Sequence, residues 1–152
     1  MNRIQYQAAR RRIGALDCVV IGPTEPDVPV AGLGVFCHGF GAGGDDLVGL
    51  AGGLLQRVDA NAPLRLVFPT APLELSDQGL PGGRAWWLLS IQRLLSAMEE
   101  RRYDVIRAEV PDGIDSARAQ LTETVELALG ECQLDSSRLL LGGFSQGAML
   151  SV

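Results

Sequence analysis

Four short apolar runs, each bounded by Gly, Pro or Asp, divide the chain and predict β-strands. They cover residues 16–21, 33–37, 64–68 and 139–141. The last three are almost continuously apolar rather than alternating, so we expect both of their faces to be covered. This pattern is typical of the parallel sheet of an α/β domain. The first run is a candidate edge strand.

A repeat of apolar residues at three- and four-residue spacing predicts an amphipathic helix over residues 47–58. Its apolar positions are Leu47, Leu50, Ala51, Leu54, Leu55 and Val58. Asp45 and Asp46 precede it as N-cap candidates. Gly49, Gly52 and Gly53 each cost a helix about 1 kcal/mol relative to alanine. We expect close packing against the sheet to compensate for that cost.

The same spacing predicts two more helices in the second half of the chain. The longer one follows Asp112-Gly113, with Gly130 as its stop signal. Its apolar stripe consists of Ile114, Ala117, Leu121, Val125 and Ala128. We expect this helix to cover the sheet just before the last strand. The shorter helix is indicated by Ile91, Leu94, Leu95 and Met98.

Composition and charge narrow the class of protein. With 152 residues, 47% of them hydrophobic, the chain is expected to form a single domain over residues 1–152. A formal net charge of −5 argues against a nucleic-acid partner, because phosphate binding needs clustered cations. The only tight basic run, residues 10–12, is interpreted as a solvated face. All 13 basic residues are arginine, which excludes mechanisms that need a lysine.

The cysteines and the N-terminus give no sign of disulfides, metal or membrane. Cys18, Cys37 and Cys132 are odd in number and far apart, and the first two lie in strand-like runs, where cysteine acts as a small buried hydrophobe. No His/Cys/Asp cluster has ligand spacing, so we expect neither a metal nor an organic cofactor. Without an apolar signal region or a run of about 18 apolar residues, we expect no membrane span and a cytoplasmic location.

A pentapeptide around Ser145 has the form of a nucleophile elbow. The apolar run at residues 139–142 leads directly into Gly143-Phe144-Ser145-Gln146-Gly147. This predicts a buried strand that delivers one serine onto a sharp turn before a helix. The positions two before and two after the serine need residues without a side chain, because the turn is strained and crowded. Glycine occupies both of these positions.

A second loop, residues 37–46, leaves a predicted strand, turns through glycines and enters a predicted helix. Ester hydrolysis passes through a tetrahedral oxyanion, which needs two preorganised backbone N–H donors. One donor comes from the residue after the nucleophile, here Gln146. The other comes from the loop after an early strand, for which Phe40 is the candidate.

The same loop also fits a pattern of dinucleotide-binding folds. Gly39 to Gly44 match G-x-G-x-x-G, although that match is weak on its own. A dinucleotide fold also needs an acidic residue at the end of the next strand, but the run 64–68 is followed by Pro69-Thr70. Asp59 has roughly the right offset but precedes that strand, so it lies at the wrong end of the sheet.

Four sequence blocks follow one another in a fixed order. They are residues 38–47 (HGFGAGGDDL), 68–72 (FPTAP), 83–87 (GRAWW) and 142–148 (GGFSQGA). Together they resemble the phospholipase/carboxylesterase family of α/β-hydrolases, which includes acyl-protein thioesterases. The resemblance runs from about Gly32 to the last residue. It implies an α/β-hydrolase fold and a serine hydrolase that acts on small-molecule carboxylic esters or thioesters.

The resemblance also implies roles for individual residues. Ser145 would be the nucleophile, with the N–H groups of Phe40 and Gln146 as oxyanion donors. The residues expected to support the oxyanion loop are His38, Gly39 and Gly41. Trp86 and Trp87 fall in the block beside the acyl pocket and would bind substrate. Ordinary core packing is an equal alternative for these two residues.

The remaining triad members are not found after Ser145. This fold orders its triad as serine, then Asp or Glu, then histidine, but the 7 residues after Ser145 include none of these partners. The only histidine, His38, is expected to orient the oxyanion loop, with a substitute base as the alternative. We therefore expect an incomplete domain that lacks its last strands and helices and is inactive alone. A non-catalytic module that binds an acyl ligand or a protein partner is the other hypothesis, and the oligomeric state is left open.

Overall fold

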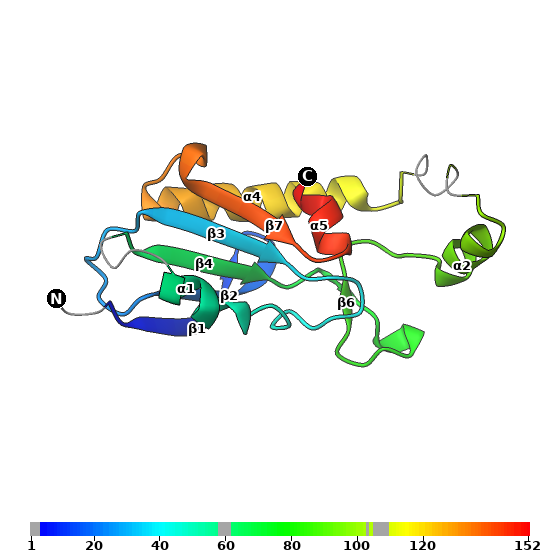
Figure 1. Ribbon diagram of the computed structural model, residues 1–152, viewed down its shortest axis with the longest axis horizontal. Helices are drawn as coiled ribbons and strands as arrows, with labels where there is room; N and C mark the ends of the chain where they lie inside the picture. The colour runs from blue at the N-terminus through cyan, green and yellow to red at the C-terminus, as the bar shows by residue number, and fades with distance from the viewer. Residues whose placement is uncertain (1–3, 58–61, 103, 105–109) are drawn as a thin grey trace.

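The computed structural model describes residues 4–57, 62–102, 104 and 110–152. Its main element is a sheet in the order β1-β2-β4-β3-β7 (Figure 1). The strands are β1 (Tyr6–Ile13), β2 (Leu16–Pro23), β4 (Leu64–Pro69), β3 (Gly32–Cys37) and β7 (Leu139–Gly143). β3 runs parallel to both of its neighbours, β4 and β7, whereas β1–β2 and β2–β4 are antiparallel pairs. The α/β architecture predicted from the sequence is confirmed, and the sheet is mixed.

The prediction that residues 16–21 form an edge strand is wrong. β2 lies between β4 and β1, and it pairs with β1 over the whole register from Tyr6↔Pro23 to Ile13↔Leu16. β1 escaped prediction because most of its side chains are exposed and it includes the arginine run at residues 10–12. A strand whose faces are largely solvated leaves no apolar run in the sequence.

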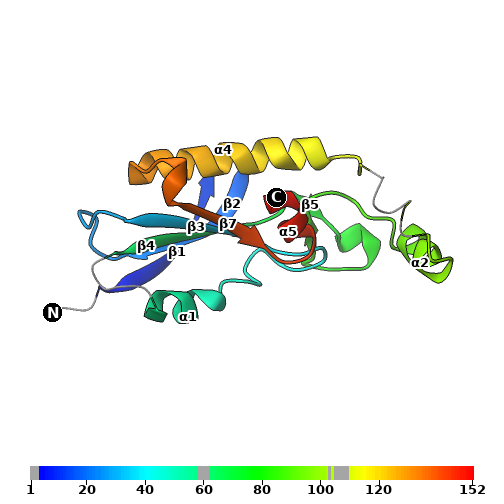
Figure 2. The ribbon, with the colours of Figure 1, turned by 45° about the horizontal axis from the view of Figure 1, so that its top comes forward.

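Helices cover both faces of the sheet (Figure 2). α4 (Ile114–Cys132) packs on one face, where Cys18, Val20 and Val35 lie in the same core cluster. α1 (Leu50–Arg57) lies on the other face, near a second cluster that contains Val19 and Ile21. Successive side chains of β2 thus alternate between the two clusters, as the period of a strand requires.

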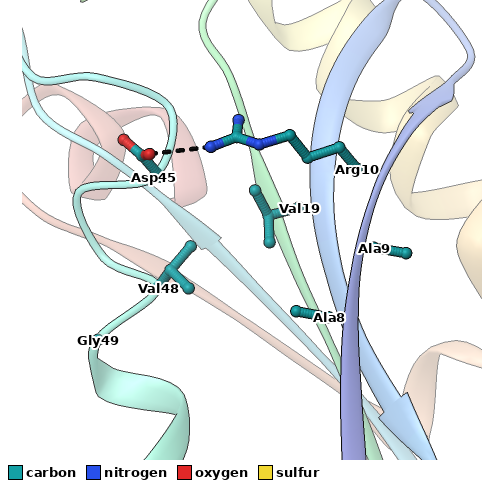
Figure 3. Close-up of a pocket in the computed structure, with 7 residues that line it drawn as sticks. All are labelled: Ala8, Ala9, Arg10, Val19, Asp45, Val48 and Gly49. Carbon is teal, nitrogen blue, oxygen red and sulfur yellow. Dashed lines mark hydrogen bonds and ion pairs between the residues drawn. The ribbon is translucent and has the colours of Figure 1, made fainter. Parts of the chain in front are cut away.

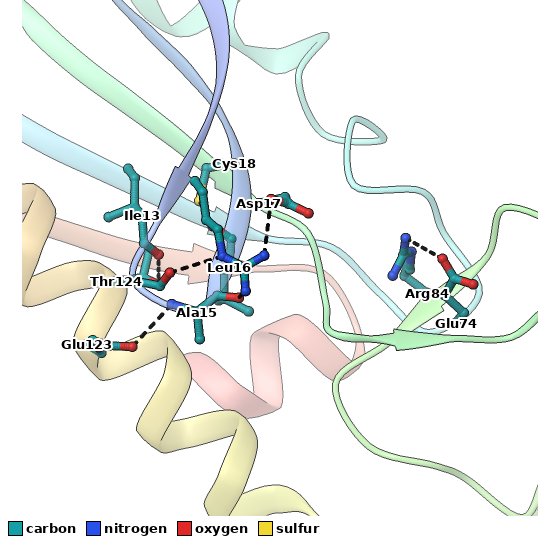
Figure 4. Close-up of polar contacts among 11 residues, drawn as sticks. Ile13, Ala15, Leu16, Asp17, Cys18, Glu74, Arg84, Glu123 and Thr124 are labelled. Atoms are coloured by element: carbon teal, nitrogen blue, oxygen red, sulfur yellow. Dashed lines mark hydrogen bonds and ion pairs between the residues drawn. The ribbon is translucent and has the colours of Figure 1, made fainter.

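α4 confirms the predicted stripe and corrects its end. Ala117, Leu121, Val125 and Ala128 are all buried against the sheet. Gly130 lies inside the last turn rather than beyond it, and the helix ends at Cys132, followed by Gln133, whose φ of 55° is left-handed. Polar contacts also tie α4 to the turn between β1 and β2 (Figure 4). Thr124 Oγ1 donates to the Ile13 carbonyl at 3.0 Å, and Glu123 accepts from the Ala15 N–H at 3.2 Å.

α1 is shorter and looser than predicted. It begins at Leu50, because residues 44–49 form turns, and Ala51 is its only buried residue. A Cβ atom added at Gly49, Gly52 or Gly53 would meet no described atom within 4 Å. Close packing therefore does not explain these glycines, contrary to expectation. Val58 and Asp59 lie outside the described residues.

The remaining elements lie largely beyond the carboxyl ends of the parallel strands (Figure 1). They are the ribbon of β5 (Leu73–Glu74) and β6 (Arg84–Ala85), the turn η1 (Ser76–Gln78), the predicted helix α2 (Ile91–Glu99), and α5 (Gln146–Ser151), while η2 (Ser136–Arg138) precedes β7. None of the helices in the described part of the chain combines the length and apolar character needed to cross a membrane.

Candidate active site

Ser145 lies on the turn between β7 and α5 in a strained backbone conformation. Its φ is 50° and its ψ is −116°, a region that non-glycine residues rarely adopt and that costs about 1–3 kcal/mol. The residue is exposed at the carboxyl edge of the sheet. The predicted strand–serine–helix geometry is therefore present.

The two glycines that flank Ser145 are required by close backbone approach. A Cβ atom at Gly147 would lie 2.1 Å from the Cys37 carbonyl oxygen and 2.5 Å from that of His38. A Cβ atom at Gly143 would lie 2.5 Å from the same Cys37 oxygen. Since real Cβ contacts are not this short, the end of β3 can press against the elbow only where side chains are absent.

This approach brings the glycine-rich loop after β3 beside the serine. β3 and β7 are parallel neighbours with Cys37 opposite Gly143, so both chains leave the sheet at the same edge. A Cβ atom built on Gly39 would lie 3.4 Å from Ser145 Cβ and 3.2 Å from the ring of Phe144. The structure thus brings together the two segments that the sequence singled out separately.

The backbone N–H groups of Phe40 and Gln146 are both available as donors. Neither has an acceptor among the described residues. For Gln146 this follows from its place as the first residue of α5, where an N–H has no intrahelical partner. The loop itself is held by Gly41 N–H, which donates to Arg84 O at 2.9 Å, and by Arg84 N–H, which donates to Ala42 O at 3.0 Å.

His38 is buried, and both of its ring nitrogens are bound to backbone. Nε2 accepts from the Ala71 N–H at 3.0 Å, so Nδ1 carries the proton and donates to the Gly39 carbonyl at 2.8 Å. Burial lowers the pKa of the imidazole, which favours this neutral tautomer. The ring braces the glycine-rich loop after β3, and neither nitrogen is directed to the Ser145 hydroxyl.

Trp86 and Trp87 belong to the core of the structure. Each side chain is 1% exposed, and both lie in the cluster under α4. The Trp86 indole N–H donates to the His38 carbonyl at 2.9 Å. The centroids of the Trp86 and His38 rings lie 5.8 Å apart. Trp87 Nε1 has no partner among the described residues. This burial favours core packing, one of the two alternatives that the sequence left open.

The side chain of Gln146 is a feature that sequence reasoning missed. It is fully buried, and its Oε1 accepts from the Trp86 N–H at 2.9 Å while its Nε2 donates to the Trp87 carbonyl at 2.8 Å. Both partners are backbone groups about 60 residues earlier in the chain. No local sequence pattern encodes such a pairing.

Comparison with known proteins agrees with this geometry. The phospholipase/carboxylesterase family matches residues 19–152. The chain belongs to this family.

Turns occupy residues 44–49, so no helix begins directly after the G-x-G-x-x-G match, as a dinucleotide site would require. Asp59, the acidic residue considered for that alternative, lies outside the described residues.

Two solved structures have the same α/β-hydrolase fold as this chain. Esterase PE8 is 25% identical, with a TM-score of 0.60 over 85% of this chain and 54% of that chain. A dienelactone hydrolase from Anabaena variabilis is 15% identical, with a TM-score of 0.51 over 99% of this chain and 56% of that one, and it shows the fold alone. The chain thus spans about half the length of these proteins. No curated protein matches it significantly.

The buried cysteines of this phospholipase/carboxylesterase family member are not reactive nucleophiles, and no metal site lies among its described residues. Burial raises the pKa of the Cys18 thiol to about 11 and that of Cys37 to about 12, so both stay protonated at neutral pH. Within the described residues, no group of three His, Cys, Asp or Glu side chains lies together as a metal site would require.

Figure 3 shows a hollow on the α1 face, and Ser145 is not among the residues that line it. It is lined by Ala8, Ala9, Arg10, Val19, Asp45, Val48 and Gly49. The ion pair between Arg10 and Asp45, at 3.0 Å, spans this hollow. Both charges are exposed, so this pair adds little stability. None of the proposed acyl-transfer groups lines it.

Proposed function

We propose that this protein is a serine hydrolase of carboxylic esters or thioesters that works through an acyl-serine intermediate. The observation that carries the proposal is Ser145 itself, exposed on a strained strand-to-helix turn with Gly39 packed beside it. The backbone N–H groups of Phe40 and Gln146, which have no acceptor within the described ranges, belong to the segments on either side. This is the arrangement that acyl transfer through an oxyanion requires.

The reaction would proceed in two halves. Ser145 Oγ attacks the carbonyl carbon of the substrate and gives up its proton to a base, and the carbonyl oxygen becomes an oxyanion. The N–H groups of Phe40 and Gln146 donate to that oxyanion. When this oxyanion collapses, the bond to the alcohol or thiol breaks. The alcohol or thiol takes up the proton and leaves, and the acyl group remains bound to Ser145 as an ester. Water then attacks the acyl-serine by the same route and releases the acid.

Among the described residues, no histidine is placed to act as the base for Ser145. His38 is committed to backbone groups through both nitrogens, and no Asp, Glu or His follows Ser145 in the sequence. We propose that the acid and the histidine come from outside these 152 residues, which form part of one α/β-hydrolase domain. A serine without a positioned base is a weak nucleophile, so the 152 residues alone would show little turnover.

A fluorophosphonate probe tests this proposal in the natural gene product that contains these residues. We expect the probe to label Ser145 covalently, with labelling and p-nitrophenyl ester hydrolysis both lost in Ser145→Ala. Ser116→Ala, which removes an exposed hydroxyl on α4, is the matched control and should label normally. A gene product that ignores the probe would instead favour a non-catalytic module that binds an acyl ligand or a protein partner.

A further inference from the structure

The amide of Gln146 joins the elbow to a distant segment of the chain. Its two hydrogen bonds, to the Trp86 N–H and the Trp87 carbonyl, occupy both ends of the amide group. The side chain is buried, so water does not compete for either bond. The position of residue 146 is therefore fixed against the backbone of residues 86–87.

The same segment also holds the oxyanion loop. Arg84 exchanges two backbone hydrogen bonds with the loop, accepting from Gly41 N–H and donating to Ala42 O. Two residues further on, the Trp86 indole donates to the His38 carbonyl. Residues 84–87 thus contact the loop on both sides of Phe40, and Trp86 and Trp87 also bind the side chain of Gln146. We call residues 84–87 the splint, because they connect the two segments that carry the N–H donors.

We propose that the Gln146 side chain is a positioning residue that sets the separation of the Phe40 and Gln146 N–H groups. This inference rests on the proposed function of Ser145. An oxyanion gains from two donors only when both aim at one point, so an error in their spacing weakens transition-state binding more than substrate binding. The side chain acts through the splint and does not itself touch the substrate.

Two substitutions keep the backbone N–H of residue 146 and change only the amide. Gln146→Met has nearly the same length and volume but removes both hydrogen bonds. Gln146→Glu, when its buried carboxyl is protonated, can still accept from Trp86 and donate to Trp87. Gln92→Ala, at an exposed position on α2, is the control. The natural gene product is used throughout.

In steady-state ester hydrolysis we expect Gln146→Met to lower kcat at least about tenfold with KM within about twofold of the wild type. Inhibition by a trifluoromethyl ketone, which forms a tetrahedral oxyanion on the serine, should weaken by a similar factor. Gln146→Glu should retain more activity than Gln146→Met. An unchanged kcat, or a raised KM alone, would overturn the positioning role.

Amide hydrogen exchange gives a second measurement that does not depend on activity. Gln146→Met should speed exchange at Gly41 about fivefold or more, while amides in the middle of α4 stay unchanged. Unchanged exchange at Gly41, or a uniform increase that includes α4, would contradict the claim that residues 84–87 link Gln146 to the loop. If the wild type fails the fluorophosphonate test, the proposed function fails, and the exchange result still decides whether Gln146 positions the loop.

Discussion

The left-handed φ of Ser145 is held by contacts of the residues on either side of it. The Cys37 carbonyl presses between Gly143 and Gly147, and the Phe144 N–H donates to that same oxygen at 3.0 Å. The strain at the serine is thereby held by contacts that only glycines permit. At the scale of single residues, the elbow depends on two missing side chains as much as on the serine.

The first prediction at this scale concerns Gly147. In Gly147→Ala the new methyl group would lie 2.1 Å from the Cys37 oxygen, so we expect a loss of about 3 kcal/mol or more in the free energy of unfolding. Ser145 labelling should fall with it. Urea denaturation measures the change. Gly52→Ala, in an open helical position, should instead be neutral or stabilising by up to about 1 kcal/mol; equal effects at both positions would contradict the steric argument.

A second prediction concerns His38 and pH. Burial holds its pKa below the ordinary value of 6.5, so below that pH the unfolded chain binds a proton that the folded chain does not. Folding stability should therefore decrease as the pH falls from 6.5 towards the folded pKa, by up to about 1.4 kcal/mol per pH unit. In His38→Asn this contribution disappears. Identical pH slopes for the two proteins in urea titrations would refute it.

At the scale of elements, α4 shows how a helix is fixed to the sheet. Its buried stripe faces β2 and β3, and Thr124 within that stripe satisfies its hydroxyl on the Ile13 carbonyl. Glu123 caps the exposed Ala15 N–H beside it. α1 on the opposite face has one buried residue, so the two faces of the sheet are covered very unequally.

This difference predicts where α4 tolerates change. Leu121 is 4% exposed and Leu127 is 46% exposed, although both are leucines in the same helix. Leu121→Ala should lower the free energy of unfolding by about 2–5 kcal/mol through lost burial and a residual cavity. Leu127→Ala should change it by less than about 1 kcal/mol. Chemical denaturation of the two variants measures both values, and similar losses would show that the packing of α4 is wrong.

At the scale of the whole molecule, chemistry gathers at one edge of the sheet. The carboxyl ends of β3 and β7 present the glycine-rich loop and the elbow side by side, and residues 84–87 are hydrogen-bonded to both. β7 is also the last strand in the sheet order, with Leu140 and Phe144 exposed on or beside it. An open strand with apolar side chains is a template for pairing with another chain.

The 152-residue chain by itself should consequently self-associate. Leu140 is 61% exposed on the open strand, and we expect Leu140→Lys to shift the protein towards monomer because a charge on an edge opposes strand pairing. Sedimentation velocity over a range of concentrations measures the shift. A wild-type chain that stays monomeric at concentrations of about 100 μM would count against this surface.

Some features of the protein were determined by the sequence alone. The elbow, the four apolar strands and the stripe of α4 were predictable because strain, periodicity and burial act between near neighbours in the chain. Each leaves a local pattern, such as the glycines two residues on either side of Ser145. The end of α4 was less predictable, since the left-handed φ that ends the helix falls on Gln133 and not on Gly130, although glycine adopts that conformation more readily.

Tertiary structure alone decided the rest. β1 is largely solvated and becomes a strand only because β2 offers it a partner. The tryptophans became core residues, and Gln146 became a link between the elbow and residues 86–87, through contacts about 60 positions apart in the chain. A sequence shows that an amide can donate and accept, but its partners are chosen only when the chain folds and distant backbone groups become buried beside it.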